Sequence, residues 1–416
     1  MPLFSPRFHP GHRVQLLQGA QELFPALVRA MDAARTSVLL ETYIFDTTGA
    51  GADIARALAR AAARGVRTQL VVDGVGTGRL PAHWFAHLRS AGVQVRVYAP
   101  LGPLGLLLPG QWRRLHRKLC VVDGTVLFCG GINILDDFHD PHFGALSAPR
   151  FDFAVRTEGA LVAQAQATME QLWWRLQAVH DARHYHLPQA VQALREAGVG
   201  LHMGMGQRTR SRTRAHSAHG LGMRAALLLR DNLRHRSRIE RAYRRAIAMA
   251  REDIIIANAY FLPGGKLRRA LVLAAQRGVR VRLLLQGRYE YFMPHHAVRP
   301  VYHTLLQAGV EIYEYAPSFL HAKVAVIDAQ GRRPWATVGS SNLDPLSLLL
   351  AREANVVVRD RACASELHAR LCQAMAGAGQ RVQAVQLAQR PWHQRLLDRV
   401  AYALMRSALW LTGNRY

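Results

Sequence analysis

Hydrophobic and amphipathic stretches alternate along the chain in a regular order. A helical stretch at 25–34 leads into an apolar run at 37–45, and a second helical stretch at 52–63 leads into an apolar run at 68–73. Short apolar runs between amphipathic helices are typical of the buried strands of an α/β sheet. Gly65, just past the second helix, fits a C-cap. This part of the chain is therefore predicted to form a sheet with helices on its faces.

The same order of elements returns later in the sequence. A helix at 238–250 precedes an apolar run at 253–261, and a helix at 266–276 precedes a run at 281–286. Self-similarity of this kind indicates a duplicated structural unit. We therefore predict two pseudo-symmetric α/β halves, each a mixed sheet flanked by helices, that share one site on a pseudo-two-fold axis.

The repeat divides the chain into four predicted segments. The N-terminal half covers 1–203 and the C-terminal half covers 221–385. Between them, 204–220 is rich in Arg, Gly and Ser, and is interpreted as a flexible basic linker or as a clamp for anionic groups. The last segment, 386–416, has Leu and Arg near helical spacing, which fits a membrane-surface helix or a helix packed on the core.

Each half carries one copy of a polar motif with the spacing H-x-K-x4-D. Each copy is followed by a glycine-containing turn and an asparagine, so neither half holds the complete set of groups alone. The first copy consists of His116, Lys118, Asp123 and Asn133, and the second consists of His321, Lys323, Asp328, Ser340 and Asn342.

Paired histidines and lysines suit the transfer of a phosphoryl group. A neutral imidazole can attack phosphorus, and a second, protonated imidazole can protonate the leaving oxygen. Lys118 and Lys323 would bind the non-bridging oxygens, while Asn133, Asn342 and Ser340 would add donors at the phosphate. With these groups present, no cofactor and no metal is expected.

Carboxylates near the motif have two predicted roles. Asp152 and Glu353 follow the asparagines, each in an apolar stretch that has the pattern of a strand. We expect them to fix the tautomers of the histidines. Asp123 and Asp328 belong to the motif and are grouped with the catalytic set. Their position near the end of a strand nevertheless suits a turn or salt-bridge role better than direct chemistry.

The charge balance points to an anionic partner. Lys and Arg number 54 against 28 Asp and Glu, which gives a formal net charge of +26. Nucleic acid and acidic membrane surfaces are both anionic, so either one would attract a protein with this positive charge. The sequence shows no secretory signal and no apolar run of about 18 residues, so a spanning helix is not expected.

These residues resemble the phospholipase D superfamily, whose signature is the doubled H-x-K-x4-D followed by G-[GS]-x-N. The resemblance extends over nearly the whole chain. Within the superfamily the chain is most similar to the bacterial cardiolipin synthases, and in particular to the short type called cardiolipin synthase B. The stretches that carry this likeness are 16–24 with 41–45, 115–118 with 130–133, and 339–344.

The resemblance implies a metal-free transfer in two steps. One histidine attacks phosphatidylglycerol, glycerol leaves, and a second phosphatidylglycerol takes the phosphatidyl group to give cardiolipin. By analogy His116 is the nucleophile and His321 the general acid and base, although the near-symmetry leaves the reverse open. Phosphatidylethanolamine, glycerol or another alcohol remain open as donor or acceptor.

The resemblance also implies partners and a location. The expected partners are the anionic phospholipid phosphatidylglycerol and a membrane surface, with no nucleic acid. The expected location is peripheral, on the cytoplasmic face of the bacterial cell membrane. An apolar loop at 101–110, followed by Trp112, precedes His116 and fits interfacial insertion or a buried loop.

Two departures from the family pattern concern the local geometry. Gly131 stands where many relatives have Ser, although the short cardiolipin synthases tolerate Gly there. The second copy also carries an insertion at 329–335, which is expected to lengthen a hairpin turn.

The sequence leaves three alternatives to cardiolipin synthesis open. A nuclease of the same superfamily would use the same groups, but the apolar loop at 101–110 argues against a DNA groove. A hydrolytic phospholipase D would differ only in admitting water to the intermediate. A basic membrane-binding scaffold would need none of the motif.

Overall fold

The structure is a computed structural model of the 416-residue chain. It describes residues 6–100, 102, 105, 113–141, 143–183, 186–206, 222–231, 235–288, 296–344, 351–384, 389 and 391–411. Apart from the single positions 102 and 105, the apolar loop predicted at 101–110 lies outside the described residues, as does Trp112. The same holds for the predicted linker beyond residue 206.

The first half contains ten strands and five helices among the described residues. Its strands are β1 (His9–Gln18), β2 (Ser37–Thr42), β3 (Arg67–Asp73), β4 (Gln94–Tyr98), β5 (Arg114–Leu115), β6 (Leu119–Val122), β7 (Val126–Gly130), β8 (His139–Asp140), β9 (Gly144–Ala145) and β10 (Phe153–Glu158). Its helices are α1 (Gly19–Asp32), α2 (Gly51–Ala63), α3 (Ala82–Ser90), α4 (Leu161–Arg183) and α5 (Leu187–Gly206).

The second half repeats this arrangement. Its strands are β11 (Met223–Arg230), β12 (Asp253–Asn258), β13 (Arg280–Gln286), β14 (Glu311–Tyr315), β15 (Lys323–Ile327), β16 (Trp335–Gly339), β17 (Ala351–Arg359) and β18 (Gly379–Arg381). Its helices include α6 (Arg238–Met249), α7 (Gly265–Gln276), α9 (Arg299–Gln307), α11 (Arg361–Ala378) and α13 (Trp392–Leu411).

Strand order confirms the predicted duplication. The first half runs β1-β10-β7-β6-β2-β3-β4, and the second half runs β11-β17-β16-β15-β12-β13-β14 with β18 added at the edge. The two series therefore match strand for strand. They join through the antiparallel pair β1 and β11, whose register shifts between His9 and His12. Parallel and antiparallel pairs occur in both halves, as a mixed sheet requires.

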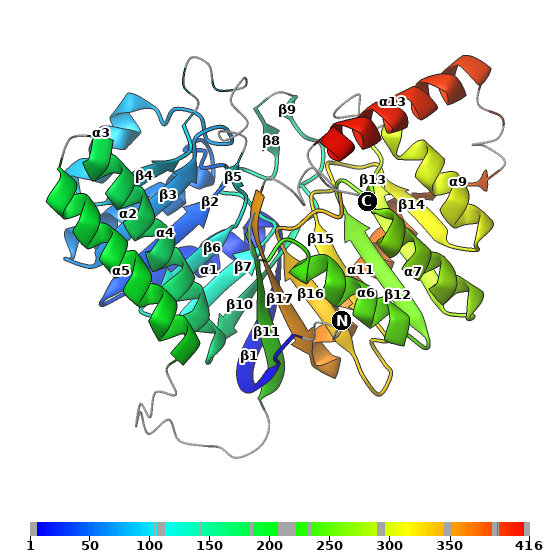
Figure 1. Ribbon diagram of the computed structural model, residues 1–416, viewed down its shortest axis with the longest axis horizontal. Coiled ribbons are helices and arrows are strands. Elements are labelled where there is room, and N and C mark those ends of the chain that lie inside the picture. Colours follow the sequence, from blue (N-terminus) through cyan, green and yellow to red (C-terminus); the bar gives the residue numbers. More distant parts are fainter. Residues whose placement is uncertain are drawn as a thin grey trace.

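The hydrophobic core consists of three large clusters and a small one. A central cluster joins both halves, because Leu39 and Val121 of the first and Ile255 and Val326 of the second belong to it. Separate clusters lie between each sheet and its outer helices, α1 and α2 in one half and α6, α7 and α9 in the other. The ribbon shows the two halves of the sheet side by side, with helices on the outer faces (Figure 1). The predicted fold class is confirmed.

Local sequence accounts for several element boundaries. α2 is rich in alanine, the residue with the highest helix propensity. α11 begins after Asp360, whose carboxylate accepts a hydrogen bond of 3.0 Å from the backbone N–H of Cys363, as an N-cap does. The segment between β15 and β16 contains the insertion, so the prediction of a lengthened hairpin turn is confirmed.

Two predicted strands end earlier than the apolar runs suggested. β2 ends at Thr42 and β12 at Asn258, and the following residues turn away from the sheets. Phe45 and Phe261 then form isolated bridges with Ile134 and with the residue after Asn342. These apolar residues are buried in the core clusters instead of extending the strands, which is why periodicity alone could not separate them from strand residues.

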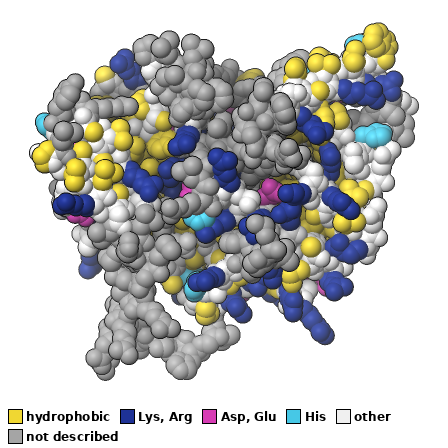
Figure 2. Space-filling view, viewed as in Figure 1, with side chains coloured by type: hydrophobic (Ala, Val, Ile, Leu, Met, Phe, Trp, Pro, Cys, Tyr) yellow, Lys and Arg dark blue, Asp and Glu magenta, His cyan; other side chains and the backbone are white. Residues whose placement is uncertain are grey.

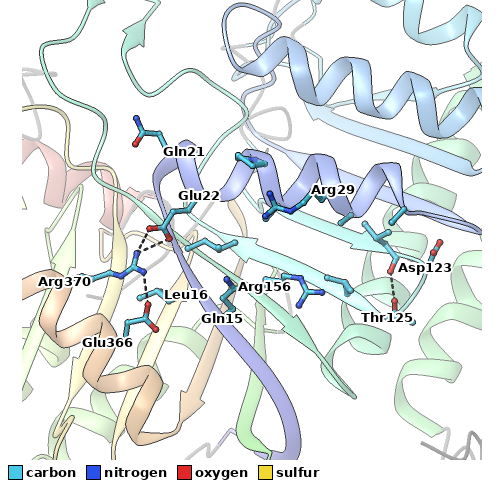
Figure 3. Close-up of a pocket in the computed structure, with 17 residues that line it drawn as sticks. Gln15, Leu16, Gln21, Glu22, Arg29, Asp123, Thr125, Arg156, Glu366 and Arg370 are labelled. Atoms are coloured by element: carbon cyan, nitrogen blue, oxygen red, sulfur yellow. Dashed lines mark hydrogen bonds and ion pairs between the residues drawn. The ribbon is translucent and has the colours of Figure 1, made fainter.

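The two halves are also held together at a polar contact away from the motif histidines. Arg370 of α11 forms ion pairs with Glu22 of α1 at 3.0 Å and with Glu366 of its own helix at 2.8 Å. A hollow of about 840 Å³ lies here, lined by β1, α1 and the turn that carries Asp123 (Figure 3). Arg370 thus links α1 of one half to α11 of the other.

Over the described ranges, none of the helices combines the length and hydropathy that a transmembrane span requires.

Candidate active site

The two motif histidines sit at matching places in the two halves. His116 lies between β5 and β6, and its backbone N–H donates to the carbonyl oxygen of Arg352 at 3.1 Å. His321 lies just before β15, and its N–H donates to the carbonyl oxygen of Phe151 at 2.9 Å. Each histidine is therefore hydrogen-bonded by its backbone to the other half. This crossed arrangement places the motifs on either side of a pseudo-two-fold axis.

The side chains of the histidines are paired across the same axis. Nδ1 of His116 lies 3.0 Å from a carboxylate oxygen of Glu353, and Nδ1 of His321 lies 2.7 Å from Oδ2 of Asp152. The sequence suggested both carboxylates, and each follows the asparagine of its own half. The structure adds that each one serves the histidine of the opposite half, leaving both Nε2 atoms for chemistry.

Both histidines line one pocket of about 820 Å³. The predicted residues on its wall also include Asn133, Asn342 and Asp152. The pocket thus brings together the groups that the two halves supply separately. Further lining residues that the sequence did not single out are Tyr43, Arg79, Arg150 and Tyr260.

The motif lysines are buried beside the histidines. Nζ of Lys118 donates to the carbonyl oxygen of His116 at 3.0 Å, and Nζ of Lys323 donates to that of His321. Burial, reinforced by the charge of Lys323, lowers the pKa of Lys118 to about 7. Two buried ammonium groups next to each other repel, so an anion between them would relieve that repulsion.

Burial also shifts the histidines and Asp152. Desolvation lowers the pKa of His116, while the nearby Glu353 carboxylate raises it in part. The pKa of His321 is lowered further, by burial and then by the charges of Lys323 and Lys118. Burial raises the pKa of Asp152 to about 7. The Asp152–His321 pair therefore retains one proton near neutral pH, as coupled groups do.

The two asparagines present their amides to the same pocket. Oδ1 of Asn133 accepts a hydrogen bond of 3.2 Å from the backbone N–H of Ile44, which directs its Nδ2 donor away from that contact. Asn342 is 2 % exposed, and its Oδ1 has no hydrogen-bond partner in the described part of the chain. A hydroxyl group of a bound substrate would satisfy that acceptor.

Gly131 and Ser340 occupy equivalent positions with different contacts. The hydroxyl of Ser340 donates to Glu353 and accepts a hydrogen bond of 3.1 Å from the N–H of Ala354. A Cβ atom on Gly131 would instead lie 2.4 Å from Oδ1 of Asp152. The carboxylate fills the space that a side chain would need, so the glycine is a requirement of packing here.

The motif aspartates lie at turns. Asp123, at the end of β6, accepts hydrogen bonds from the backbone N–H groups of Arg35, Thr36 and Ser37 at 2.8–2.9 Å. Asp328 accepts them from residues 251–253 at the start of β12 in the same way. Both aspartates have positive φ, of 50° and 49°. These contacts fit the turn role that the sequence favoured, and the grouping of both aspartates with the catalytic set stays a prediction.

Sequence reasoning missed a carboxylate that holds the chain just before His116. Asp73 at the end of β3 is fully buried, and Oδ2 accepts from the N–H of Leu115 at 2.7 Å. Its Oδ1 contacts Nη1 of Arg114 at 3.2 Å. The sequence did contain a signal, namely an aspartate at the end of an apolar strand. A buried carboxylate there needs hydrogen-bond or ion-pair partners.

A metal site needs several ligands close together, and this requirement applies to the described residues. Within them, no three His, Cys, Asp or Glu side chains form a group that could hold a metal ion.

Comparison with known proteins agrees with the site. A family model described as "Cardiolipin synthase, PLD-like domain" matches residues 27–173 and 243–375. Cardiolipin synthase B of Escherichia coli K12 is 34% identical over 97% of this chain and 90% of its own length. A cardiolipin synthase of Halalkalibacterium halodurans is 28% identical over 82% of this chain and 61% of its own.

Solved structures share the fold at low sequence identity. Phosphatidylserine synthase of Haemophilus influenzae matches with a TM-score of 0.65 and 12% identity, over 99% of this chain and 97% of that one. Polyphosphate kinase of Porphyromonas gingivalis matches with a TM-score of 0.52 and 13% identity, over 95% of this chain and 53% of that one.

The family predicted from the doubled motif is thereby confirmed: this chain belongs to the cardiolipin synthases with phospholipase D-like domains.

Proposed function

We propose that this protein is a phosphatidyltransferase that makes cardiolipin from two molecules of phosphatidylglycerol. The observation that carries the proposal is the single pocket in which His116 and His321 each pair with a carboxylate of the other half. Family membership supplies the substrate class, since the relatives that match over most of this chain are cardiolipin synthases. We propose further that it acts as a peripheral protein on the cytoplasmic face of the cell membrane.

In the first step, Nε2 of His116 attacks the phosphorus of phosphatidylglycerol. The bond between phosphorus and the glycerol oxygen breaks, and that oxygen takes the proton held by the His321–Asp152 pair. The raised pKa of Asp152 supports this assignment, because the pair is protonated near neutral pH. Lys118 and Lys323 neutralise the charge on the non-bridging oxygens, as buried cations do in phosphoryl transfer.

In the second step, the hydroxyl of another phosphatidylglycerol gives its proton to His321. Its oxygen attacks the phosphorus, and the bond between phosphorus and Nε2 of His116 breaks to release cardiolipin. The reverse assignment, with His321 as nucleophile, has one observation in its favour: the pKa of His321 is lowered further than that of His116, which keeps its imidazole neutral.

Product analysis tests the reaction. The protein is incubated with phosphatidylglycerol and the lipids are measured by mass spectrometry, with His116→Ala and His321→Ala as inactive controls. Cardiolipin and free glycerol are expected in equal amounts. Phosphatidic acid alone would indicate a hydrolase, and nicked plasmid DNA with unchanged lipid would indicate a nuclease.

Trapping the intermediate tests the assignment of the two histidines. Acid-sensitive phosphatidyl adducts are mapped by peptide mass spectrometry after a rapid quench under alkaline conditions. An adduct on the peptide containing His116 supports the assignment, and one on the peptide containing His321 reverses it. If the wild type makes no product while His116→Ala binds vesicles as the wild type does, the result favours a scaffold over an enzyme.

A further inference from the structure

Helix α13 carries a stripe of hydrophobic side chains that face away from the protein. Trp392 is 71% exposed, Leu396 53%, Val400 45% and Leu404 57%. Residues four apart lie on one face of an α-helix, so these four side chains form a continuous line. Leu397, also exposed, widens the line at its middle. An apolar surface of this kind on a folded protein marks a site that something else covers.

Contacts on the opposite face of α13 fix the orientation of the helix, with its hydrophobic stripe exposed to solvent. Ala401 and Met405 are buried in the core cluster of the second half. The carboxylate of Asp398 lies 2.6 Å from Nδ1 of His296, and the hydroxyl of Tyr402 accepts a hydrogen bond of 3.1 Å from Arg268. The helix therefore cannot rotate to bury its hydrophobic stripe without breaking these contacts.

A row of arginines runs beside the apolar stripe. Arg395, Arg399 and Arg406 are exposed, and their spacing of four and seven residues places them on one line of the helix. Hydrophobic side chains of α13 and neighbouring Lys or Arg side chains gather at the upper right of the molecule (Figure 2). An apolar face with a tryptophan and a cationic edge is the pattern of helices that lie in the headgroup region of acidic membranes.

The position of α13 relates it to the pocket. The pocket lies at the carboxyl ends of β2 and β3, where Tyr43 and Val75 line it. His296, which holds Asp398 of α13, follows the carboxyl end of the equivalent strand β13. In the ribbon, α13 lies at the same upper edge as β8 and β9 (Figure 1). Asp140 of β8 lines the pocket.

We propose that α13 docks the protein on an anionic bilayer, with its apolar stripe among the lipid headgroups and its arginines against their phosphates. Docking at this edge turns the pocket mouth toward the lipid that supplies its substrate. The inference rests on the proposed function for its choice of occupant, since a phosphatidyltransferase must reach lipid in a membrane. It goes further in assigning the contact to one helix.

Vesicle binding by the full-length protein tests the proposal. The variant Val400→Asp/Leu404→Asp is compared with Val191→Asp/Leu194→Asp on α5, whose side chains are exposed to similar extents, 50% and 57%. In sedimentation with vesicles of phosphatidylglycerol and phosphatidylcholine, the α13 variant is expected to bind on the order of tenfold more weakly, and the α5 variant like the wild type. Equal binding by both variants and the wild type would overturn the proposal.

The arginines have a separate readout. Arg395→Gln/Arg399→Gln/Arg406→Gln is expected to weaken binding to phosphatidylglycerol vesicles by roughly a hundredfold, since each basic residue contributes near an acidic surface. Binding of that variant to pure phosphatidylcholine vesicles should match the weak binding of the wild type. A loss that is the same on both vesicle types would contradict the role of charge.

Activity separates docking from chemistry. With short-chain phosphatidylglycerol dispersed as single molecules, the Val400→Asp/Leu404→Asp variant should equal the wild type, whereas on vesicles it should be slower. A wild type that binds vesicles through α13 but makes no product from either substrate would refute the proposed function and leave the docking surface standing. If light scattering shows that the variant separates a dimer while vesicle binding is unchanged, the stripe joins two copies and the proposal fails.

Discussion

Nδ1 of His116 lies 3.0 Å from the carboxylate of Glu353, a residue 237 positions away that belongs to the opposite half. The matching pair, His321 and Asp152, crosses in the other direction. A motif histidine therefore acquires its orienting carboxylate only when both halves fold together. Within one half alone, the motif histidine has no orienting carboxylate. This gives a structural reason why two motifs form one site.

Glu353→Gln should lower activity far more than it lowers stability. The amide keeps the size of the side chain but has no charge to stabilise a charged imidazole, and its NH2 group can donate to Nδ1 and favour the wrong tautomer. We expect the rate of cardiolipin formation to fall on the order of 10²–10⁴-fold, by analogy with the orienting carboxylate of hydrolase triads. Single-turnover kinetics measure the effect. The control is Glu366→Gln, an exposed carboxylate paired with Arg370, which should leave the rate unchanged.

Gly131→Ser should impair the enzyme even though it restores the residue that many relatives carry. Its Cβ would meet Oδ1 of Asp152 at 2.4 Å, so the carboxylate would have to leave His321. We expect a loss of activity, with the folded protein still present by circular dichroism. Gly377→Ser on α11 is the matched control, because no atom lies within 4 Å of the added Cβ. Full activity of Gly131→Ser would contradict the packing argument.

Ser340→Ala tests the equivalent position in the other half. Without the hydroxyl, the buried N–H of Ala354 and one oxygen of Glu353 lose a hydrogen-bond partner. Leaving such groups unsatisfied costs about 1–3 kcal/mol, so the free energy of unfolding should fall by that amount. Urea unfolding measures the fall. A change within experimental error would mean that water replaces the hydroxyl.

The pH dependence of kcat/KM should be bell-shaped with its maximum below pH 7. Burial lowers the pKa of His116 from 6.5, so the neutral nucleophile is lost only on the acid side of that value. As the pH rises through about 7, Lys118 loses its charge and the Asp152–His321 pair loses its proton, because burial has moved both pKa values there. Both losses lower the rate on the alkaline side.

Initial rates on short-chain phosphatidylglycerol between about pH 5 and about pH 9 measure this profile. Asp152→Asn removes one of the groups that titrate near 7 and should change the shape of the alkaline limb as well as the maximal rate. A profile that stays flat on the alkaline side would show that neither Lys118 nor the Asp152–His321 pair titrates there.

Much of the fold was predictable because its signals are local and repeated. The doubled motif and the matching order of helices and strands predicted the two halves, and the candidate histidines and asparagines line the pocket together with Asp152. The crossed pairing of Asp152 and Glu353 was not predictable, because it depends on how the two sheets pack and not on spacing within either half. Asp73 was missed for a different reason, because its partners Arg114 and Leu115 lie 41 and 42 positions away, in β5.

The buried pair of Arg117 and Glu41 shows how far the two halves differ. Arg117 is 2% exposed and Glu41 1%, and Nη2 of Arg117 lies 2.8 Å from Oε2 of Glu41. At the equivalent places the second half has Ala322 and Ala257, because Glu41 pairs with Leu119 in the sheet as Ala257 pairs with Val324. Burial raises the pKa of Glu41 and lowers that of Arg117, so each charge depends on the other.

Removing one partner of this pair should cost more than removing both. Glu41→Gln leaves a buried guanidinium without its carboxylate and should lower the free energy of unfolding by about 3–5 kcal/mol. The double variant Glu41→Gln/Arg117→Met removes both charges and should recover part of that loss, as measured by urea unfolding in a double-mutant cycle. If the double variant were as unstable as the sum of the single variants, the two residues would contribute to stability independently, and the buried ion pair would not couple them.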